Sequence, residues 1–163
     1  MRIALASDHR GFSAKEKIKA YLASKGHEVL DFGCNSNASC DYPDSALPAA
    51  ECVASSRSDV GILMCGTGIG MSMTANKVRG VRAALCHDEL TAQLSRAHNN
   101  ANVLCLPADL IGEELMRRVI DVWLGTRFDA GRHERRVAKI VEYEARCQPD
   151  ARSGGSTGAC SAS

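Results

Sequence analysis

The chain has 163 residues, of which 45% are hydrophobic and 24% are charged, and its formal net charge is +1. This length favours one domain, and this composition is that of an ordinary globular protein and not of a disordered or membrane protein. A charge balance so close to neutral argues against a large basic surface for nucleic acid. The apolar start, residues 1–6, is too short for a signal peptide or a membrane span, so we expect a cytoplasmic protein.

The first half of the chain predicts two strands and two helices. Residues 2–7 and 27–32 are strand-like, and residues 13–24 between them have apolar side chains at helical spacing, with Gly26 ending the helix. Residues 33–44 are polar and include Pro43, which favours a loop. Ser45 is then the expected N-cap of a helix that ends near residue 56.

The second half predicts three more strands. Residues 60–64 form an apolar strand that stops at a glycine-rich turn, and a helix is expected at 72–77. Further strands are expected at 81–85 and 102–106, and further helices at 88–97, 111–124 and 133–146. The alternation of strands and helices predicts a single-domain, three-layer α/β/α fold with a five-stranded parallel, Rossmann-like sheet. We assign the domain to residues 1–147, and the Pro-, Gly-, Ser- and Ala-rich residues 148–163 to a mobile tail.

The cysteines and histidines do not form a metal-binding or disulfide framework. The eight cysteines include no Cys-x-x-Cys pair, and several stand in apolar segments that suit a small hydrophobic side chain. A disulfide between Cys34 and Cys40 is disfavoured in a reducing compartment. His27, His87 and His133 lack metal-ligand spacing, so no metal site is predicted.

A cysteine and three alternating glycines stand at the end of the strand at 60–64. The turn, residues 65–70, lets the backbone approach a ligand closely and present amide hydrogens to an anion. Met71 occupies the position where a dinucleotide fingerprint needs glycine, and no Walker pattern follows. Cys65 at such a turn is favoured as a thiolate and could transfer a proton. The alternative is a glycine turn that serves only tight packing.

Three other groups could carry chemistry. Asp8 and His9 follow the first strand, at the edge where parallel sheets bind ligands, although a simple turn would use the same residues. His98 and Asn99 precede the last strand, and we expect them to project toward the same edge; a helix-capping role is the alternative. Arg132 and Arg136 share a helix face and could hold a phosphate dianion, or could simply be solvated.

The combined motifs resemble the ribose-5-phosphate isomerase B family over about residues 1–146. The resemblance rests on Asp8-His9, Asp41-Tyr42-Pro43, and residues 65–70 with 75–77, 95–99 and 131–136. It implies an enzyme that interconverts ribose 5-phosphate and ribulose 5-phosphate through a cis-enediolate, with no cofactor and no metal. It also implies a homodimer or a dimer of dimers with shared active sites, and no nucleic-acid or membrane partner.

The resemblance implies a role for each matched residue. Cys65 would take the proton next to the carbonyl, His98 would be the acid that opens the sugar ring, and Thr67 would relay hydroxyl protons. One branch of the family uses a glutamate after the glycine turn, and Met71 at that position assigns this chain to the cysteine branch. Asp109, and some of the arginines, would act on the substrate of the neighbouring subunit. The implied substrate-binding residues are Asp8, His9, Tyr42, Gly66, Gly68, Ile69, Gly70, Asn99, Asp109, Arg132 and Arg136.

Two alternative functions remain open from the sequence. A hexose 6-phosphate isomerase of the allose or galactose type would use the same chemistry in a longer pocket. A non-catalytic phosphosugar-binding module would need the glycine turn and the arginines but neither Cys65 nor His98.

Overall fold

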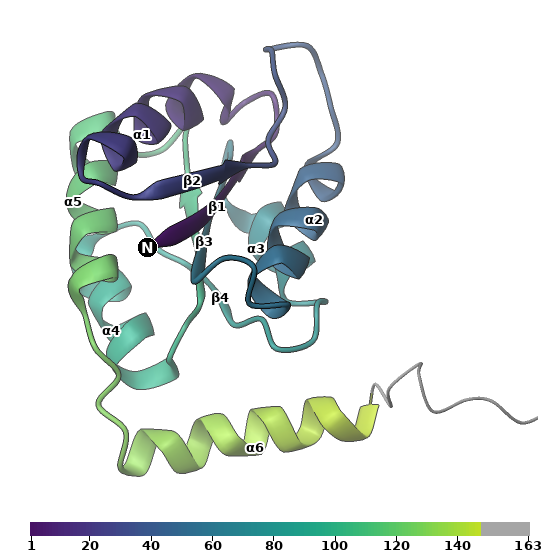
Figure 1. Ribbon diagram of the computed structural model, residues 1–163, viewed down its shortest axis with the longest axis vertical. Coiled ribbons are helices and arrows are strands. Elements are labelled where there is room, and N and C mark those ends of the chain that lie inside the picture. Colours follow the sequence, from purple (N-terminus) through teal and green to yellow (C-terminus); the bar gives the residue numbers. More distant parts are fainter. Residues whose placement is uncertain (148–163) are drawn as a thin grey trace, which may run out of the picture.

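The strands of the computed structural model, which describes residues 1–147, form one parallel sheet (Figure 1). Their order across the sheet is β2-β1-β3-β5-β4, with every neighbouring pair parallel. The strands are β1 (Arg2–Ser7), β2 (Glu28–Asp31), β3 (Val60–Cys65), β4 (Ala83–Leu85) and β5 (Val103–Pro107). The five-stranded parallel sheet predicted from the sequence is thereby confirmed. The predicted tail, residues 148–163, lies outside the described residues.

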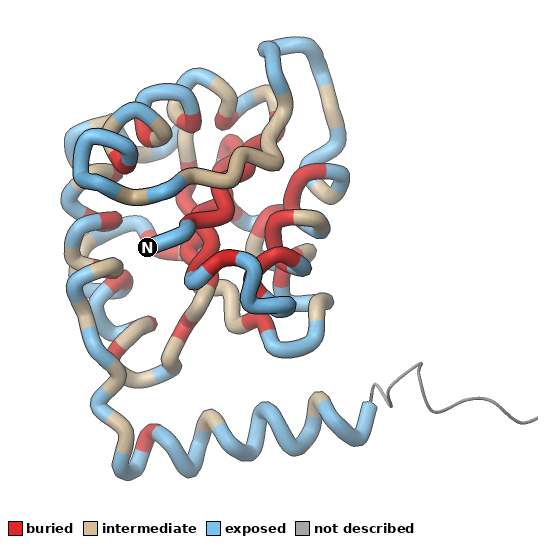
Figure 2. Tube along the Cα trace, in the orientation of Figure 1, coloured by how far each residue is buried: buried red, intermediate tan, exposed pale blue. Residues whose placement is uncertain are grey.

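Helices cover both faces of the sheet, which makes the three predicted layers. One face carries α1 (Phe12–Ser24), α4 (Glu89–Asn99) and α5 (Glu113–Gly125), and the other carries α2 (Tyr42–Ala54) and α3 (Ile69–Ala75). Side chains alternate along β1, so that Ile3 and Leu5 join the core under α1 and α5, while Ala4 and Ala6 face α2. The buried strands run through the middle of the molecule (Figure 2).

The helix α2 begins earlier than the sequence indicated. Its first residue is Tyr42, and Asp41 before it has an extended backbone. Pro43 stands in the first turn, where its fixed φ suits a helix and its missing N–H would have no partner anyway. Ser45 is therefore buried inside the helix and does not cap it. The prediction of a loop through residue 44 was wrong because proline can begin a helix as well as exclude one.

The helix α3 follows the glycine turn directly. It begins at Ile69 and not at residue 72, after Gly68 in a left-handed conformation with φ of +73°. The turn and the helix are one continuous structure. The other helix predictions hold within one or two residues, and Asp88 caps α4 by accepting a hydrogen bond from the Thr91 amide at 2.7 Å.

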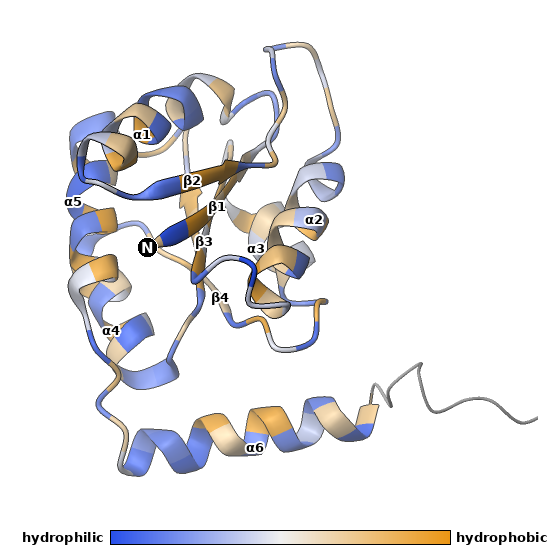
Figure 3. Cartoon of the chain, in the orientation of Figure 1, coloured by the Kyte–Doolittle hydropathy of each residue, from blue (hydrophilic) through white to orange (hydrophobic). Residues whose placement is uncertain are grey.

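The last helix, α6 (Arg132–Cys147), extends away from the sheet (Figure 1). One stripe of it is hydrophobic and the rest is hydrophilic (Figure 3). Ile140, Val141 and Tyr143 are 52%, 45% and 63% exposed. His133 is the buried residue of this helix. Within residues 1–147, no helix has the length and apolar character needed to cross a membrane.

Candidate active site

A cavity of about 220 Å³ lies at the carboxyl edge of the sheet, where the parallel strands end. It brings together seven of the predicted site residues, which come from segments far apart in the chain: Asp8, Tyr42, Cys65, Gly66, Thr67, Gly70 and Asp109. Its lining residues are Asp8, Arg10, Tyr42, Cys65, Gly66, Thr67, Gly70 and Asp109.

Cys65 is the last residue of β3, and its side chain contributes to this cavity although the residue is only 5% exposed. The Gly68 amide donates a hydrogen bond to the Cys65 Sγ atom at 3.1 Å. Gly68 has a φ of +73°, and a Cβ atom there would lie 3.1 Å from the Leu106 backbone, so this turn favours glycine. This hydrogen bond holds the Sγ atom against the glycine turn.

The other glycines of the turn allow two side chains to close over the backbone. A Cβ on Gly66 would lie 2.4 Å from Asp109 Oδ2, and one on Gly70 would lie 2.8 Å from the Tyr42 ring. The Ile69 amide donates to the Thr67 hydroxyl at 3.4 Å. The amides of Gly68 and Ile69 are thus used within the turn, so fewer amides face a ligand than the sequence indicated.

Asp8 and His9 follow β1 and hold the adjoining backbone. Asp8 is 5% exposed, and its Oδ1 accepts hydrogen bonds from the amides of Arg10 and Gly11 at 2.9 and 3.0 Å. His9 faces the loop before α2, where the Cys40 amide donates to His9 Nδ1 at 3.3 Å. Asp8 therefore lines the cavity, whereas His9 supports its wall.

His98 and Asn99 lie at the opposite edge of the sheet, contrary to the sequence-based expectation. The helix α4 starts near the carboxyl end of β4 and ends just before the first residue of β5. A helix that joins two parallel strands must return to the amino edge, so its last residues cannot reach the carboxyl edge of the same chain. The prediction placed them there because it considered the motif and not the direction of the helix.

A histidine cluster, consisting of His98, Asp129, Arg132, His133 and Arg136, forms where the end of α4 meets α6. The rings of His98 and His133 stack with their centroids 4.1 Å apart and their planes 3° apart. Asp129 Oδ2 lies 4.0 Å from His98 Nε2. Burial lowers the pKa of His133, and the charges of His98, Arg132 and Arg136 lower it further, whereas Asp129 acts to raise it.

The stack was not anticipated from the sequence, where His133 was excluded as a metal ligand and otherwise stood only within the matched residues 131–136. Its position beside Arg132 could have indicated a shared site, but no local pattern shows that two histidines from different helices meet.

Asp109 belongs to the cavity of its own chain. The Asp109 amide donates to the Gly66 carbonyl at 3.0 Å, and its carboxylate pairs with Arg10. That Asp109 serves the neighbouring subunit's substrate stays a prediction. Arg10 lines the same cavity and was missed, because a single arginine after a strand carries no motif.

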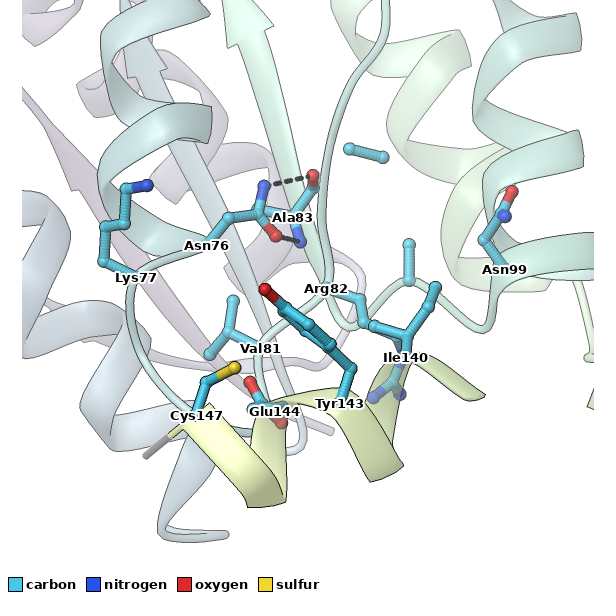
Figure 4. A pocket seen from close by; sticks show the side chains of 12 residues that line it. Asn76, Lys77, Val81, Arg82, Ala83, Asn99, Ile140, Tyr143, Glu144 and Cys147 are labelled. Atoms are coloured by element: carbon cyan, nitrogen blue, oxygen red, sulfur yellow. Dashed lines mark hydrogen bonds between the residues drawn. The ribbon is translucent and has the colours of Figure 1, made fainter. Parts of the chain in front are cut away.

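A second cavity, of about 490 Å³, lies between α6 and the β4 edge of the sheet (Figure 4). Tyr143, Glu144 and Cys147 of α6 line it opposite Asn76, whose side-chain amide bonds both the N–H and the carbonyl of Ala83 at 2.9 Å. Of the predicted site residues only Asn99 reaches it. In residues 1–147, no three His, Cys, Asp or Glu side chains are grouped closely enough to hold a metal ion.

Comparison with known proteins assigns the family. The model of the family described as ribose/galactose isomerase matches residues 3–140. Ribose-5-phosphate isomerase B of Escherichia coli is 45% identical over 145 residues, which is 89% of this chain and 97% of that protein. D-erythrulose-4-phosphate isomerase of Pectobacterium atrosepticum is 41% identical over 145 residues, 88% of this chain and 95% of that protein.

A solved structure carries a ligand in the same fold. Ribose-5-phosphate isomerase B from Mycoplasma genitalium, determined with bound ribulose-5-phosphate, superposes with a TM-score of 0.84 and is 46% identical. The match covers 88% of this chain and 95% of that one. The similarity thus spans the whole sheet, the cavity and the histidine cluster, and the chain belongs to the ribose/galactose isomerase family of sugar-phosphate isomerases.

Proposed function

We propose that this enzyme interconverts ribose 5-phosphate and ribulose 5-phosphate, with Cys65 as the base. The observation that carries the proposal is the cysteine itself, which lines a cavity beside Asp8 and Tyr42 and accepts a hydrogen bond from the Gly68 amide. The ribulose-5-phosphate bound to the Mycoplasma genitalium relative supports this substrate. A cysteine at a cavity of this size suits proton transfer at carbon better than it suits simple binding.

The reaction balances because two protons change place: one moves from carbon 2 to carbon 1, and one moves from the oxygen on carbon 2 to the oxygen on carbon 1. The Cys65 thiolate takes the proton from carbon 2 of the open-chain aldose, and the electron pair of that bond forms the double bond of a cis-enediolate. The negative charge moves to the oxygen on carbon 1, where hydrogen-bond donors such as the free amides of the turn stabilise it. The thiol then returns its proton to carbon 1, while Thr67 relays the hydroxyl proton between the two oxygens. The product is the ketose, and no electron leaves the substrate.

A second copy of the chain completes this site in our proposal. Within one chain, His98, Asn99, Arg132 and Arg136 lie near the amino edge and Cys65 lies at the carboxyl edge. A homodimer can bring the amino edge of one subunit to the cavity of the other. The exposed Ile140, Val141 and Tyr143 of α6 supply an apolar surface for such a contact. His98 of the partner subunit would then open the ring, and the partner's Arg132 and Arg136 would hold the phosphate.

Mixing two inactive variants tests the shared site directly. Cys65→Ala and His98→Asn each remove one half of every site, so each homodimer should be inactive. A mixed dimer contains one site with both residues intact. After the subunits are exchanged at equal amounts, about a quarter of wild-type activity should return, because half of the dimers are mixed and each has one working site of two. No recovery, despite subunit exchange confirmed by mass spectrometry, would contradict the shared site.

The substrate is tested on the purified enzyme in the presence of a chelator. Ketose should appear from ribose 5-phosphate, and proton exchange with solvent should occur at carbon 2. Three other sugar phosphates serve as comparison substrates. Allose 6-phosphate and galactose 6-phosphate represent the hexose alternative, and the family is described as ribose/galactose isomerase. Erythrulose 4-phosphate is included because the Pectobacterium relative is named as its isomerase. Binding of ribose 5-phosphate without exchange would favour the non-catalytic module instead.

A further inference from the structure

Arg10 lines the cavity, and neither the sequence motifs nor the proposed reaction assigns it a role. It directly follows His9, and its amide donates to Asp8 Oδ1 at 2.9 Å, which fixes its backbone at the end of β1. Its side chain is 60% exposed. The Nε and Nη2 atoms of the guanidinium both lie 2.6 Å from the same oxygen of Asp109, Oδ2.

The Arg10–Asp109 pair sits directly over the glycine turn. A Cβ on Gly66 would lie 2.6 Å from Arg10 Nε and 2.4 Å from Asp109 Oδ2, so this residue has to be glycine for the pair to form. The backbone of Asp109 is itself tied to the turn, because its amide donates to the Gly66 carbonyl at 3.0 Å. The guanidinium is thus held at the cavity next to Cys65 from two separate strands.

A phosphate group could bind in this cavity only beside a positively charged side chain. In the described part of the chain, its lining includes two carboxylates, Asp8 and Asp109, and Arg10 is its one cation. A phosphate monoester carries a charge of about −1.5 to −2 at neutral pH, and unpaired carboxylates would repel it. Asp109 occupies Nε and Nη2 through a single oxygen, and no other acceptor within residues 1–147 bonds the Arg10 side chain. The Nη1 side of the guanidinium is therefore available for two parallel hydrogen bonds to a phosphate.

We propose that Arg10 binds the phosphate group of the substrate from the same subunit that supplies Cys65, and that Asp109 is a positioning residue that holds its guanidinium. The inference rests on the proposed function for the identity of the phosphosugar. It makes Arg10 a specificity-determining residue, because the free side of its guanidinium would bind the phosphate that distinguishes a phosphorylated sugar from an unphosphorylated one.

Steady-state kinetics of Arg10→Gln on ribose 5-phosphate test this role. The KM should rise about ten-fold, since a charge-assisted hydrogen bond to substrate is lost, while kcat stays within about three-fold. The inhibition constant of inorganic phosphate should rise by the same factor as KM. Arg10→Lys keeps the charge but loses the planar donor pair, so its KM should lie between those of the wild-type enzyme and Arg10→Gln. Asp109→Asn should raise KM less than Arg10→Gln and add nothing to it in the double variant.

Arg57→Gln is the matched control, because Arg57 lies in the loop between α2 and the first residue of β3, at the amino edge, and its Nε donates to the Ser55 hydroxyl at 3.1 Å. It removes the same charge and should leave KM unchanged. Stabilisation against heat by inorganic phosphate, compared with chloride at equal ionic strength, gives a readout that needs no turnover: Arg10→Gln should lose it. An Arg10→Gln variant with unchanged KM and phosphate response, or with kcat alone reduced, would overturn the role of Arg10. An inactive wild-type enzyme would instead overturn the proposed function.

Discussion

The two edges of the sheet carry different kinds of side chain. The carboxyl edge has a thiol, two carboxylates and one guanidinium around a cavity of about 220 Å³. The amino-edge cluster has two stacked imidazoles with Arg132 and Arg136 beside them. In the proposed reaction, the first edge supplies the base, and the second supplies the ring-opening acid and two arginines for the phosphate. The proposed site therefore needs both sets of residues, which one chain holds at opposite edges of its sheet.

This difference has a simple topological origin. Every strand of a parallel sheet ends at the same edge, and every connecting helix returns to the other. Residues after β1, β3 and β5 therefore gather at the cavity, as Asp8, Gly66 and Asp109 do. Residues at the end of α4 gather at the amino edge. Association of two copies would let an enzyme use both sets of residues in one site.

Among the substitutions considered, removal of the Cys65 thiol should change turnover most. Cys65→Ala should lower kcat by a factor of about 10² to 10⁴, the usual contribution of a general base, and should leave the fold intact. Stopped-flow or coupled assays give kcat, and proton exchange at carbon 2 should fall in parallel.

Cys52→Ala is the control for Cys65→Ala. Cys52 is also buried, at 1% exposed, but it lies in α2 away from the cavity lining. Its substitution should leave kcat unchanged. Equal losses in the two variants would show that the effect on turnover comes from packing and not from proton transfer.

The ion pairs at the two edges should differ strongly in their contribution to stability. At the carboxyl edge, Lys15 has a fully buried side chain whose Nζ lies 2.7 Å from Asp31 Oδ2. Asp31→Asn leaves this ammonium with only the partly exposed Glu16 as a counter-ion. We expect the free energy of unfolding to fall by about 3 kcal/mol, as measured by urea denaturation.

The matched variant at the amino edge is Asp59→Asn. Its partner Arg2 lies at 3.1 Å, and both side chains are more than 40% exposed, at 46% for Arg2 and 42% for Asp59. The expected loss is about 0.5–1 kcal/mol, because solvent screens the pair. Similar losses for both variants would mean that burial of Lys15 does not decide the cost.

Burial raises the pKa of Asp31, but the hydrogen bonds from Lys15, Lys19 and the Gly33 amide outweigh it and leave the pKa lowered. A lowered folded-state pKa stabilises the protein above the usual pKa of a carboxyl group, and this contribution is lost as the pH falls through the folded value. The Asp31→Asn and wild-type stabilities should therefore converge in acid.

The sequence predicted the cavity well where the chemistry is local. Cys65 and the glycines follow a buried strand within a few residues, so strand and turn together indicated both the location and the need for small residues. The start of α2 was missed because Pro43 is compatible with a loop and with a first helical turn, and only the backbone of Asp41 distinguishes the two.

Contacts between distant segments could not be predicted in the same way. Arg10 and Asp109 meet because β1 and β5 flank β3, a strand order that no single segment of sequence encodes. The His98–His133 stack likewise depends on where α6 crosses the end of α4. The edge at which His98 lies was predictable in principle, since a residue just before a strand belongs to the amino edge, but the motif alone led to the wrong edge.

The smallest expected effect is a change in pH dependence at the amino edge. The pKa of His133 is lowered by burial and by the positive charges of His98, Arg132 and Arg136, so the folded state binds this proton less readily than the unfolded chain. The contribution to stability is then complete above the usual histidine pKa of 6.5 and is lost as the pH falls through the lower folded pKa. His133→Gln should remove part of the decrease in stability between about pH 7.5 and pH 5.5, measured by urea denaturation at each pH. His87→Gln removes an exposed imidazole instead and should keep the wild-type slope. If both variants show the wild-type slope, the buried ring of His133 does not control the acid response of this edge, and the cluster is held by its stacking and packing alone.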